Sequence, residues 1–307
     1  MTIRVVAGIL ISLFGWIGAG QGQTVQTNAP RLIIRCDDID FCHGANMALK
    51  RVADSGVVSS VSVIVTTPWL DEAVEILKQH PEISVGVHLV LNSEWRNYKW
   101  GPVTPVDRVP SLVDGFGKFY GTRKEFFSHR PSIKEVAREL RAQVDLAKRK
   151  GLKISYIDNH MGTAIGTREF QAEMEKIPAE NHIGISRYFG EQEVPNVYDI
   201  PPEQKLAQAL KNLNTITNDG LYLLVCHIGT DDAEMQAMVD SNAFGPKNMA
   251  QHRQAEADVL CSPEYKAALR AKGIQLVGYK TVLEQEKMRR PFLSDKYEDV
   301  VKQAAGK

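Results

Sequence analysis

Short apolar runs alternate with amphipathic segments along most of the chain, and this alternation restricts the fold more than any other feature. The strand-like runs cover 31–36, 57–65, 83–91, 153–158, 183–189, 221–228 and 274–279. Helical patterns cover 45–56, 69–81, 133–151 and 253–272. Strands that alternate with helices predict a parallel α/β fold. We expect a distorted TIM-like (β/α) barrel with about seven parallel strands in a single domain; a doubly wound sheet is the alternative.

The first residues form a separate unit. Residues 1–22 contain one arginine, a continuous apolar run and small residues at its end. This order is typical of a secretory signal peptide, and an uncleaved membrane anchor is the alternative. Residues 23–30 then form a polar linker, 31–290 the main domain and 291–307 a C-terminal tail. We expect a secreted or periplasmic protein without stable membrane insertion after signal cleavage.

Charge and cysteine content exclude several classes of partner. The 37 basic and 37 acidic residues balance to a formal charge of +0, which gives no support to a nucleic-acid partner. The four cysteines contain no CxxC pair, so a thiolate zinc site is not expected. Burial as small apolar residues is the favoured interpretation, and a disulfide between Cys36 and Cys226 stays open.

Polar residues interrupt four of the strand-like runs near their carboxyl ends. Asp37 and Asp38 follow the first run, His88 lies in the third, His160 follows the fourth and His227 ends the sixth. Ligands of parallel α/β folds bind where these strand ends converge. At any single position, a hydrogen-bonded core histidine or an aspartate that caps a helix is the plain alternative.

The adjacent aspartates carry the chemical argument. Two carboxylates at the end of an apolar strand are costly unless a positive charge lies beside them, and a divalent metal would supply it. One aspartate and two neutral imidazoles leave open metal positions, as catalysis requires. The second aspartate can take a proton from the activated water, and a further histidine can protonate a leaving amine. These parts indicate a hydrolase, and Asp40 is expected to shape the loop.

The same segments resemble the YdjC/ChbG family of carbohydrate deacetylases. "RCDDID" matches the family's Ala-Asp-Asp-Phe-Gly, "GVHL" carries a metal histidine, and "YIDNHMG" is similar to its Asp-Ser-His-x-His. "LLVCHIG" resembles Cys-His-Pro-Gly, while "VPSLVDGFGKFY" and "HRQAEADVL" resemble two further segments. The similarity runs in order from Arg31 to Glu284.

This resemblance implies a role for each residue. Asp38, His88 and His160 would hold one divalent metal ion, Zn or Mg before Mn, Co or Ni. Asp37 would be the general base, and His227 the general acid or a transition-state stabiliser. The implied reaction removes N-acetyl groups from amino sugars or oligosaccharides, on a distorted (β/α) barrel.

Substrate contacts are expected from the long aromatic loop at 92–120 and from two other positions. Trp95 and Trp100 would suit stacking on sugar rings, and packing of the loop on its own aromatics is the alternative. His43 lies close to the aspartate pair in sequence, and Arg253 belongs to the resembling helix. We name all four as tentative substrate-binding residues. A homodimer stays an open alternative.

Three departures from the family pattern keep other functions open. Ile39-Asp40 replaces Phe-Gly, Gly162 stands in place of a second histidine, and Ile228 replaces proline. A non-catalytic glycan-binding protein on a deacetylase scaffold is therefore one alternative. A metal-dependent phosphoesterase ranks last, because it would favour two metals and more carboxylates.

Overall fold

The computed structural model describes residues 29–217, 219–243 and 245–289. The expected signal peptide at 1–22 and the tail at 291–307 lie outside the described residues. Within the described ranges, no helix combines the length and apolar character needed to cross a membrane.

Eight strands and ten α-helices make up the described chain. The strands are β1 (Arg31–Ile39), β2 (Ser60–Val63), β3 (Ser84–Leu89), β4 (Ile154–Asn159), β5 (Gly184–Ile185), β6 (Gln192–Glu193), β7 (Leu221–His227) and β8 (Gln275–Leu276). The helices are α1 (His43–Asp54), α2 (Leu70–Lys78), α3 (Arg123–Ser128), α4 (Ile133–Arg149), α5 (Arg168–Asn181), α6 (Lys205–Asn212), α7 (Ala233–Gln236), α8 (Met249–Cys261), α9 (Pro263–Ala271) and α10 (Tyr279–Gln285).

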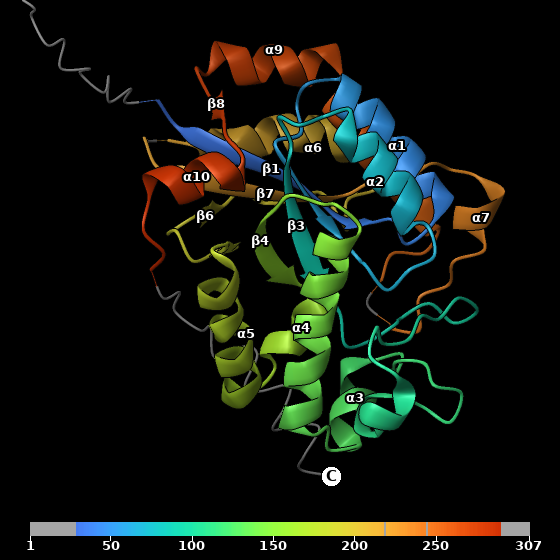
Figure 1. The fold of residues 1–307 in the computed structure, drawn as a ribbon. Helices are drawn as coiled ribbons and strands as arrows, with labels where there is room; N and C mark the ends of the chain where they lie inside the picture. The colour runs from blue at the N-terminus through green and yellow to red at the C-terminus, as the bar shows by residue number, and fades with distance from the viewer. Residues whose placement is uncertain (1–28, 218, 244, 290–307) are drawn as a thin grey trace, which may run out of the picture.

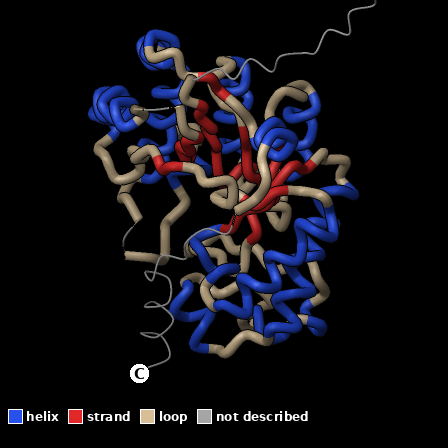
Figure 2. Tube along the Cα trace, turned by 90° about the vertical axis from the view of Figure 1, so that its left-hand side faces the viewer, coloured by secondary structure: helices blue, strands red, loops and turns tan. Residues whose placement is uncertain are grey.

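The strands form one parallel sheet in the order β5-β4-β3-β2-β1-β7-β6, and β8 pairs with the start of β1. The sheet lies at the centre with helices around it (Figures 1 and 2). β5 and β6 follow each other in the chain yet occupy opposite ends of the strand order, so the sheet curls into an incomplete barrel. The expected distorted TIM-like barrel is confirmed, including the seven anticipated strands; the short β6 was not anticipated.

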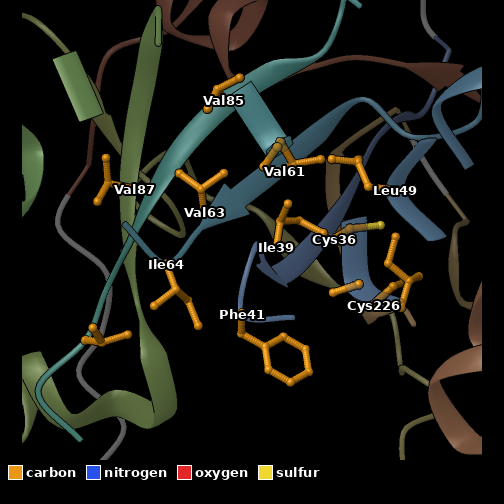
Figure 3. Packing of buried hydrophobic residues seen from close by; sticks show 14 of the residues in the cluster. Cys36, Ile39, Phe41, Leu49, Val61, Val63, Ile64, Val85, Val87 and Cys226 are labelled. Carbon is orange, nitrogen blue, oxygen red and sulfur yellow. The ribbon is translucent and has the colours of Figure 1, made fainter. Parts of the chain in front are cut away.

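Alternating side chains divide the core into an outer and an inner part. On β1, Leu32, Ile34 and Cys36 belong to the large outer cluster beneath the helices, whereas Ile33 belongs to a smaller cluster with Tyr156 and Tyr279. Figure 3 shows Cys36 beside Cys226 in the outer core. These two residues lie opposite each other in the β1–β7 register, as buried free thiols.

The inner part of the sheet is filled tightly at its centre. Tyr156 and Tyr279 place their ring centroids 4.2 Å apart, and the Tyr156 hydroxyl donates to the Val61 carbonyl. Gly86 on β3 faces the Tyr156 ring so closely that a Cβ atom would lie 2.3 Å from it. The inner face is therefore closed below the carboxyl ends of the strands.

The expected single helix at 253–272 was wrong in its extent. The structure contains two helices, α8 and α9, separated at Ser262. Ser262 has extended backbone angles and its side chain accepts a hydrogen bond from Tyr265 N, while Pro263 occupies the first turn of α9. A serine followed by proline is a start signal for a new helix, because proline cannot donate within a continuing one.

Candidate metal and catalytic site

A bulge at the end of β1 brings both aspartates to the same cavity. In a regular strand, successive side chains would point to opposite faces of the sheet. Here Cys36 pairs with Val61 and Ile39 with Val63, so β1 carries one extra residue. Asp38 takes a left-handed φ of 57° within this bulge. Asp37 and Asp38 consequently line one cavity, although they are neighbours in sequence.

This cavity measures about 840 Å³ and lies at the carboxyl ends of β1, β3, β4 and β7. That position is the usual ligand site of parallel α/β folds. The structure thus brings together the five residues that sequence and resemblance assigned to catalysis and metal binding, and all of them line the cavity: Asp37, Asp38, His88, His160 and His227.

Three of these residues point one donor atom each toward a common centre. Asp38 Oδ1 lies 3.3 Å from His88 Nε2 and 3.1 Å from His160 Nδ1. The two imidazole nitrogens are 3.2 Å apart. A tetrahedral ion with bonds of about 2.0–2.1 Å separates its ligands by about 3.3 Å. The buried triangle therefore fits one face of such a coordination sphere.

A carboxylate orients each of the two histidines from its far side. His88 Nδ1 lies 3.0 Å from Asp158 Oδ1, and His160 Nε2 lies 2.8 Å from Glu94 Oε2. All four side chains are buried. Metal-ligating histidines usually have such partners, which fix the ring and increase its basicity.

Neighbouring carboxylates raise the pKa of both histidines. Burial opposes a charged imidazole, yet Asp158 and Asp37 hold the pKa of His88 well above its usual value. Burial also opposes the charged form of His160, but Glu94 and Asp38 raise its pKa to about 9. Burial also disfavours the Asp38 anion, but Arg253 and His160 outweigh it and hold its pKa well below the usual range. The pocket thus favours a positive charge at the two imidazoles.

Two arginines also neutralise the aspartate pair. Arg35 binds Asp37 through two hydrogen bonds, Nε to Oδ1 at 2.6 Å and Nη2 to Oδ2 at 2.7 Å. Arg253 Nη2 donates to Asp38 Oδ2 at 2.7 Å. Arg35 Nη2 lies 3.0 Å from Asp158 Oδ2 as well. The positive charge that the adjacent carboxylates require therefore comes in part from these two arginines.

A second group of donors lies nearby but suits a metal less well. Asp37, His88 and Asp158 also place donor atoms within 4.8 Å of one another. Arg35 already contacts both of these carboxylates. Its guanidinium supplies the positive charge that an ion would bring, so we favour the Asp38 triangle as the metal site.

His227 lies across the site from the triangle. It ends β7 opposite Asp37 in the β1–β7 register, and its ring contacts Tyr198 edge to face at 5.1 Å between centroids. Burial lowers the pKa of His227, with Arg253 adding to the effect, although Asp38 acts in the opposite direction. This imidazole differs electrostatically from His88 and His160 and would readily release a proton.

The tentative substrate residues divide into two groups. Trp95 and Arg253 line the cavity but are only 2% exposed, with the Arg253 guanidinium 4.8 Å from the Phe41 ring centroid. Trp100 is buried against Tyr98 and is not among the cavity-lining residues; neither is His43. His43 Nδ1 contacts Glu72 Oε1 at 2.9 Å instead. Within the loop Tyr98 contacts Trp100, whereas Trp95 stacks on Phe41 and Trp100 also contacts the His160 ring edge to face, so the loop aromatics pack both on each other and on the rest of the domain.

The two departures beside the site have clear local roles. Asp40 is buried with a φ of 73°, and its Oδ1 accepts a hydrogen bond from Ile64 N at 2.7 Å, so it shapes the loop as expected. Gly162 lines the cavity with a φ of 71°. Glycine adopts this conformation without strain.

Sequence reasoning assigned no role to several residues that build the site. The alternation rule gives a signal for Asp158, because it lies two positions before His160 and therefore faces the same side. Glu94 and Asp240 come from irregular loops without a period that could point to them. These loops are joined by hydrogen bonds from Ser241 N to Glu94 O and from Arg96 N to Val239 O, both 2.8 Å.

Comparisons with known proteins agree with this geometry. The family model described as YdjC-like protein matches residues 31–188. A protein named carbohydrate deacetylase from Brevibacillus brevis is 36% identical over 131 residues, covering 42% of this chain and 48% of that protein. Another of that name from Enterococcus faecalis is 25% identical over 267 residues, covering 82% of this chain and 98% of that protein.

A solved structure shares the fold. It is described as a putative cellobiose-phosphate cleavage protein from Enterococcus faecalis and superposes with a TM-score of 0.69 at 23% identity. The match covers 83% of this chain and 99% of that one. The family match spans just over half of the sequence and includes β1 with Asp37 and Asp38, β3 with His88, and His160 directly after β4. The chain belongs to the YdjC-like protein family.

Proposed function

We propose that this protein is a metal-dependent carbohydrate N-deacetylase that removes acetyl groups from N-acetylated sugars or oligosaccharides. The names of the related proteins support this substrate class. The observation that carries the proposal is the buried triangle of Asp38, His88 and His160, which shares its cavity with Asp37 and His227. Hydrolysis of an amide requires these parts in one place.

One divalent ion would be held by Asp38 Oδ1, His88 Nε2 and His160 Nδ1. Two nitrogens and one oxygen suit zinc better than magnesium, which prefers oxygen ligands. When bound, the ion supplies Lewis acidity toward water and toward the acetyl carbonyl. Asp158 and Glu94 would keep the two imidazoles oriented for binding.

The remaining groups would move the protons. Asp37 accepts the proton of the attacking water, while Arg35 holds both of its oxygens in a fixed orientation. The water oxygen bonds to the acetyl carbon and the carbon–nitrogen bond then breaks. His227 in its imidazolium form would give a proton to the departing nitrogen, while Asp37 keeps the proton taken from water, so the products are a free amine and acetic acid, which ionises to acetate.

We also propose that the protein acts outside the cytoplasm. The apolar run within residues 1–22 supports this location. Cell fractionation with N-terminal sequencing of the mature chain tests it. A mature protein recovered in the cytoplasm with its first residues intact would contradict it.

The decisive experiment measures acetate released by the purified protein. A panel of N-acetylated monosaccharides and oligosaccharides is incubated before and after chelation, and again after each metal is restored. Acetate release should stop with chelator, return with zinc, and fall at least about a hundredfold in Asp37→Asn. Asp71→Asn, an exposed carboxylate on α2, is the matched control and should behave like the wild type.

Other outcomes discriminate among the alternatives. Sugar binding without acetate release would favour a non-catalytic glycan-binding protein. Phosphate release from sugar phosphates, without acetate release, would favour a phosphoesterase. Acetate release that persists after complete metal removal would overturn the proposed metal dependence.

A further inference from the structure

One face of α8 contacts both sides of the catalytic cavity. Arg253 and Glu256 are three residues apart and therefore lie on the same side of the helix. Arg253 holds Asp38, and Glu256 Oε2 accepts a hydrogen bond of 2.9 Å from the backbone N–H of His227. Both side chains are about 2% exposed. Glu256 thus acts on the backbone of a residue that our proposed function uses for proton transfer.

The contact with His227 replaces a missing strand neighbour. β6 pairs only with Tyr222 and Leu223 of β7, so the sheet ends there before β7 does. On the β6 side of β7, the Leu223 carbonyl accepts a hydrogen bond from Val194 N. His227 lies four residues later, so its N–H points to the same side of β7. A buried N–H without a partner would be costly. Glu256 supplies the acceptor.

A buried lysine holds Glu256 and the neighbouring wall of the cavity together. Lys205 Nζ lies 3.2 Å from Glu256 Oε1 and donates to the carbonyls of Val197 and Tyr198 at 2.7 and 3.0 Å. Its side chain is fully buried. The Tyr198 ring in turn contacts the His227 ring. The ion pair therefore fixes the backbone of both residues whose rings meet at the cavity.

We infer that the buried Lys205–Glu256 pair is a positioning device, which sets His227 and Tyr198 in the geometry needed for protonation of the leaving nitrogen. This inference rests on the proposed function only for its kinetic consequence. A buried ion pair is weak support for stability, because apolar residues of similar size often replace one without loss. Its contacts to His227 and Tyr198 give it a geometric role instead.

Two paired variants separate positioning from general stability. Lys205→Met with Glu256→Leu removes both charges and leaves His227 N–H without an acceptor. Lys205→Met with Glu256→Gln also removes both charges, but its amide oxygen can still accept from His227 N–H. Neither leaves an unpaired buried charge, so both are expected to fold.

The measurements are amide hydrogen exchange and ring resonances of His227 by NMR, zinc affinity, and steady-state acetate release. In the Met/Leu variant we expect exchange at His227 to speed up about tenfold. Its kcat should fall about 10–100-fold, because small displacements of catalytic groups cost this much. KM and zinc affinity should change less than about twofold, since neither altered side chain contacts a proposed metal ligand's side chain. The Met/Gln variant should recover most of the protection at His227 but only part of kcat, because it restores the acceptor for His227 N–H and not the Lys205 donor to the Tyr198 carbonyl.

The inference is overturned if the Met/Leu variant keeps wild-type exchange at His227, or if its kcat stays unchanged while exchange speeds up. A parallel loss of zinc affinity and kcat in both variants would indicate a general structural role and would overturn it as well. If the wild-type protein releases no acetate, the proposed function fails separately. Even then, wild-type exchange and ring resonances of His227 in the Met/Leu variant would reject the positioning role, and altered ones would support it.

Discussion

Removing the charge of Glu94 should weaken metal binding, and the size of the loss should depend on pH. Glu94 Oε2 lies 2.8 Å from His160 Nε2, and both side chains are buried. Outer carboxylates of this kind are worth about 10–100-fold in metal affinity. Glu94→Gln should therefore lower the intrinsic zinc affinity by this factor, or about 1.4–2.7 kcal/mol.

Proton competition modifies this loss in a calculable way. The same carboxylate helps to raise the pKa of His160 to about 9. A metal must displace that proton, so at pH 7 the His160 proton alone lowers the wild-type zinc affinity by about 100-fold. The raised pKa of His88 adds a second competing proton, so the affinity should rise at least about tenfold per pH unit up to pH 9. In Glu94→Gln the pKa of His160 falls and the affinity becomes less dependent on pH. The zinc affinity of the variant should thus fall furthest below that of the wild type near pH 9, and the two affinities should lie closer together at pH 7.

Competition with a chelating indicator at pH 7, 8 and 9 measures both effects. Glu135→Gln is the matched control, because Glu135 holds Ser111 in the same loop without touching a histidine. The zinc affinity of Glu135→Gln should equal that of the wild type at all three pH values. Equal zinc affinities of wild type and Glu94→Gln at pH 9 would refute the reasoning, as would a wild-type affinity that does not change between pH 7 and pH 9.

Three further changes test other parts of the structure. Arg253→Met removes the guanidinium from the buried Asp38 carboxylate and leaves only the His88 and His160 rings beside it, so the metal-free protein should lose about 1.5–3 kcal/mol in urea unfolding; zinc should raise its Tm more than that of the wild type, and an equal rise would contradict this. Gly86→Ala places a Cβ 2.3 Å from the Tyr156 ring and should cost at least about 1–3 kcal/mol; wild-type stability in the same assay would show that the ring can move away. Burial raises the pKa of Glu139 above its usual 4.5, so its contribution to stability is present below that pH and is lost as the pH rises through the raised value. The Tm of Glu139→Gln relative to wild type should therefore increase between pH 4.5 and 7, and a constant difference would argue against this titration.

The fold and the central site residues were within reach of the sequence because both depend on periodic patterns. Strand alternation with helices predicts the parallel sheet, and polar residues at strand ends identify Asp37, Asp38, His88 and the other two histidines. Those patterns place side chains only to the extent that strands are regular. The bulge that turns Asp38 into the cavity has no signature in "RCDDID", since either aspartate could face inward.

The parts that could not be predicted depend on contacts between distant segments. Arg35 lies two residues before Asp37 in sequence, but its bonds to Asp37 and Asp158 depend on the shape of the curled sheet. Glu94 belongs to a loop whose position is set by the 237–243 segment. His43 is near the aspartates in sequence, yet it begins a helix that carries it toward Glu72.

The strand order has a consequence for when the protein can become active. β1 pairs with β7, so Arg31 lies beside Leu221 and Asp37 beside His227. Such distant pairings form slowly, since a long stretch of chain must close before the contact is gained. A partly synthesised chain that ends before β7 would hold all three proposed metal ligands but lack His227. In the proposed mechanism, deacetylation must therefore wait until β7 has been made and paired with β1, and a chain that ends earlier would carry the proposed metal ligands without the proton donor for the leaving nitrogen.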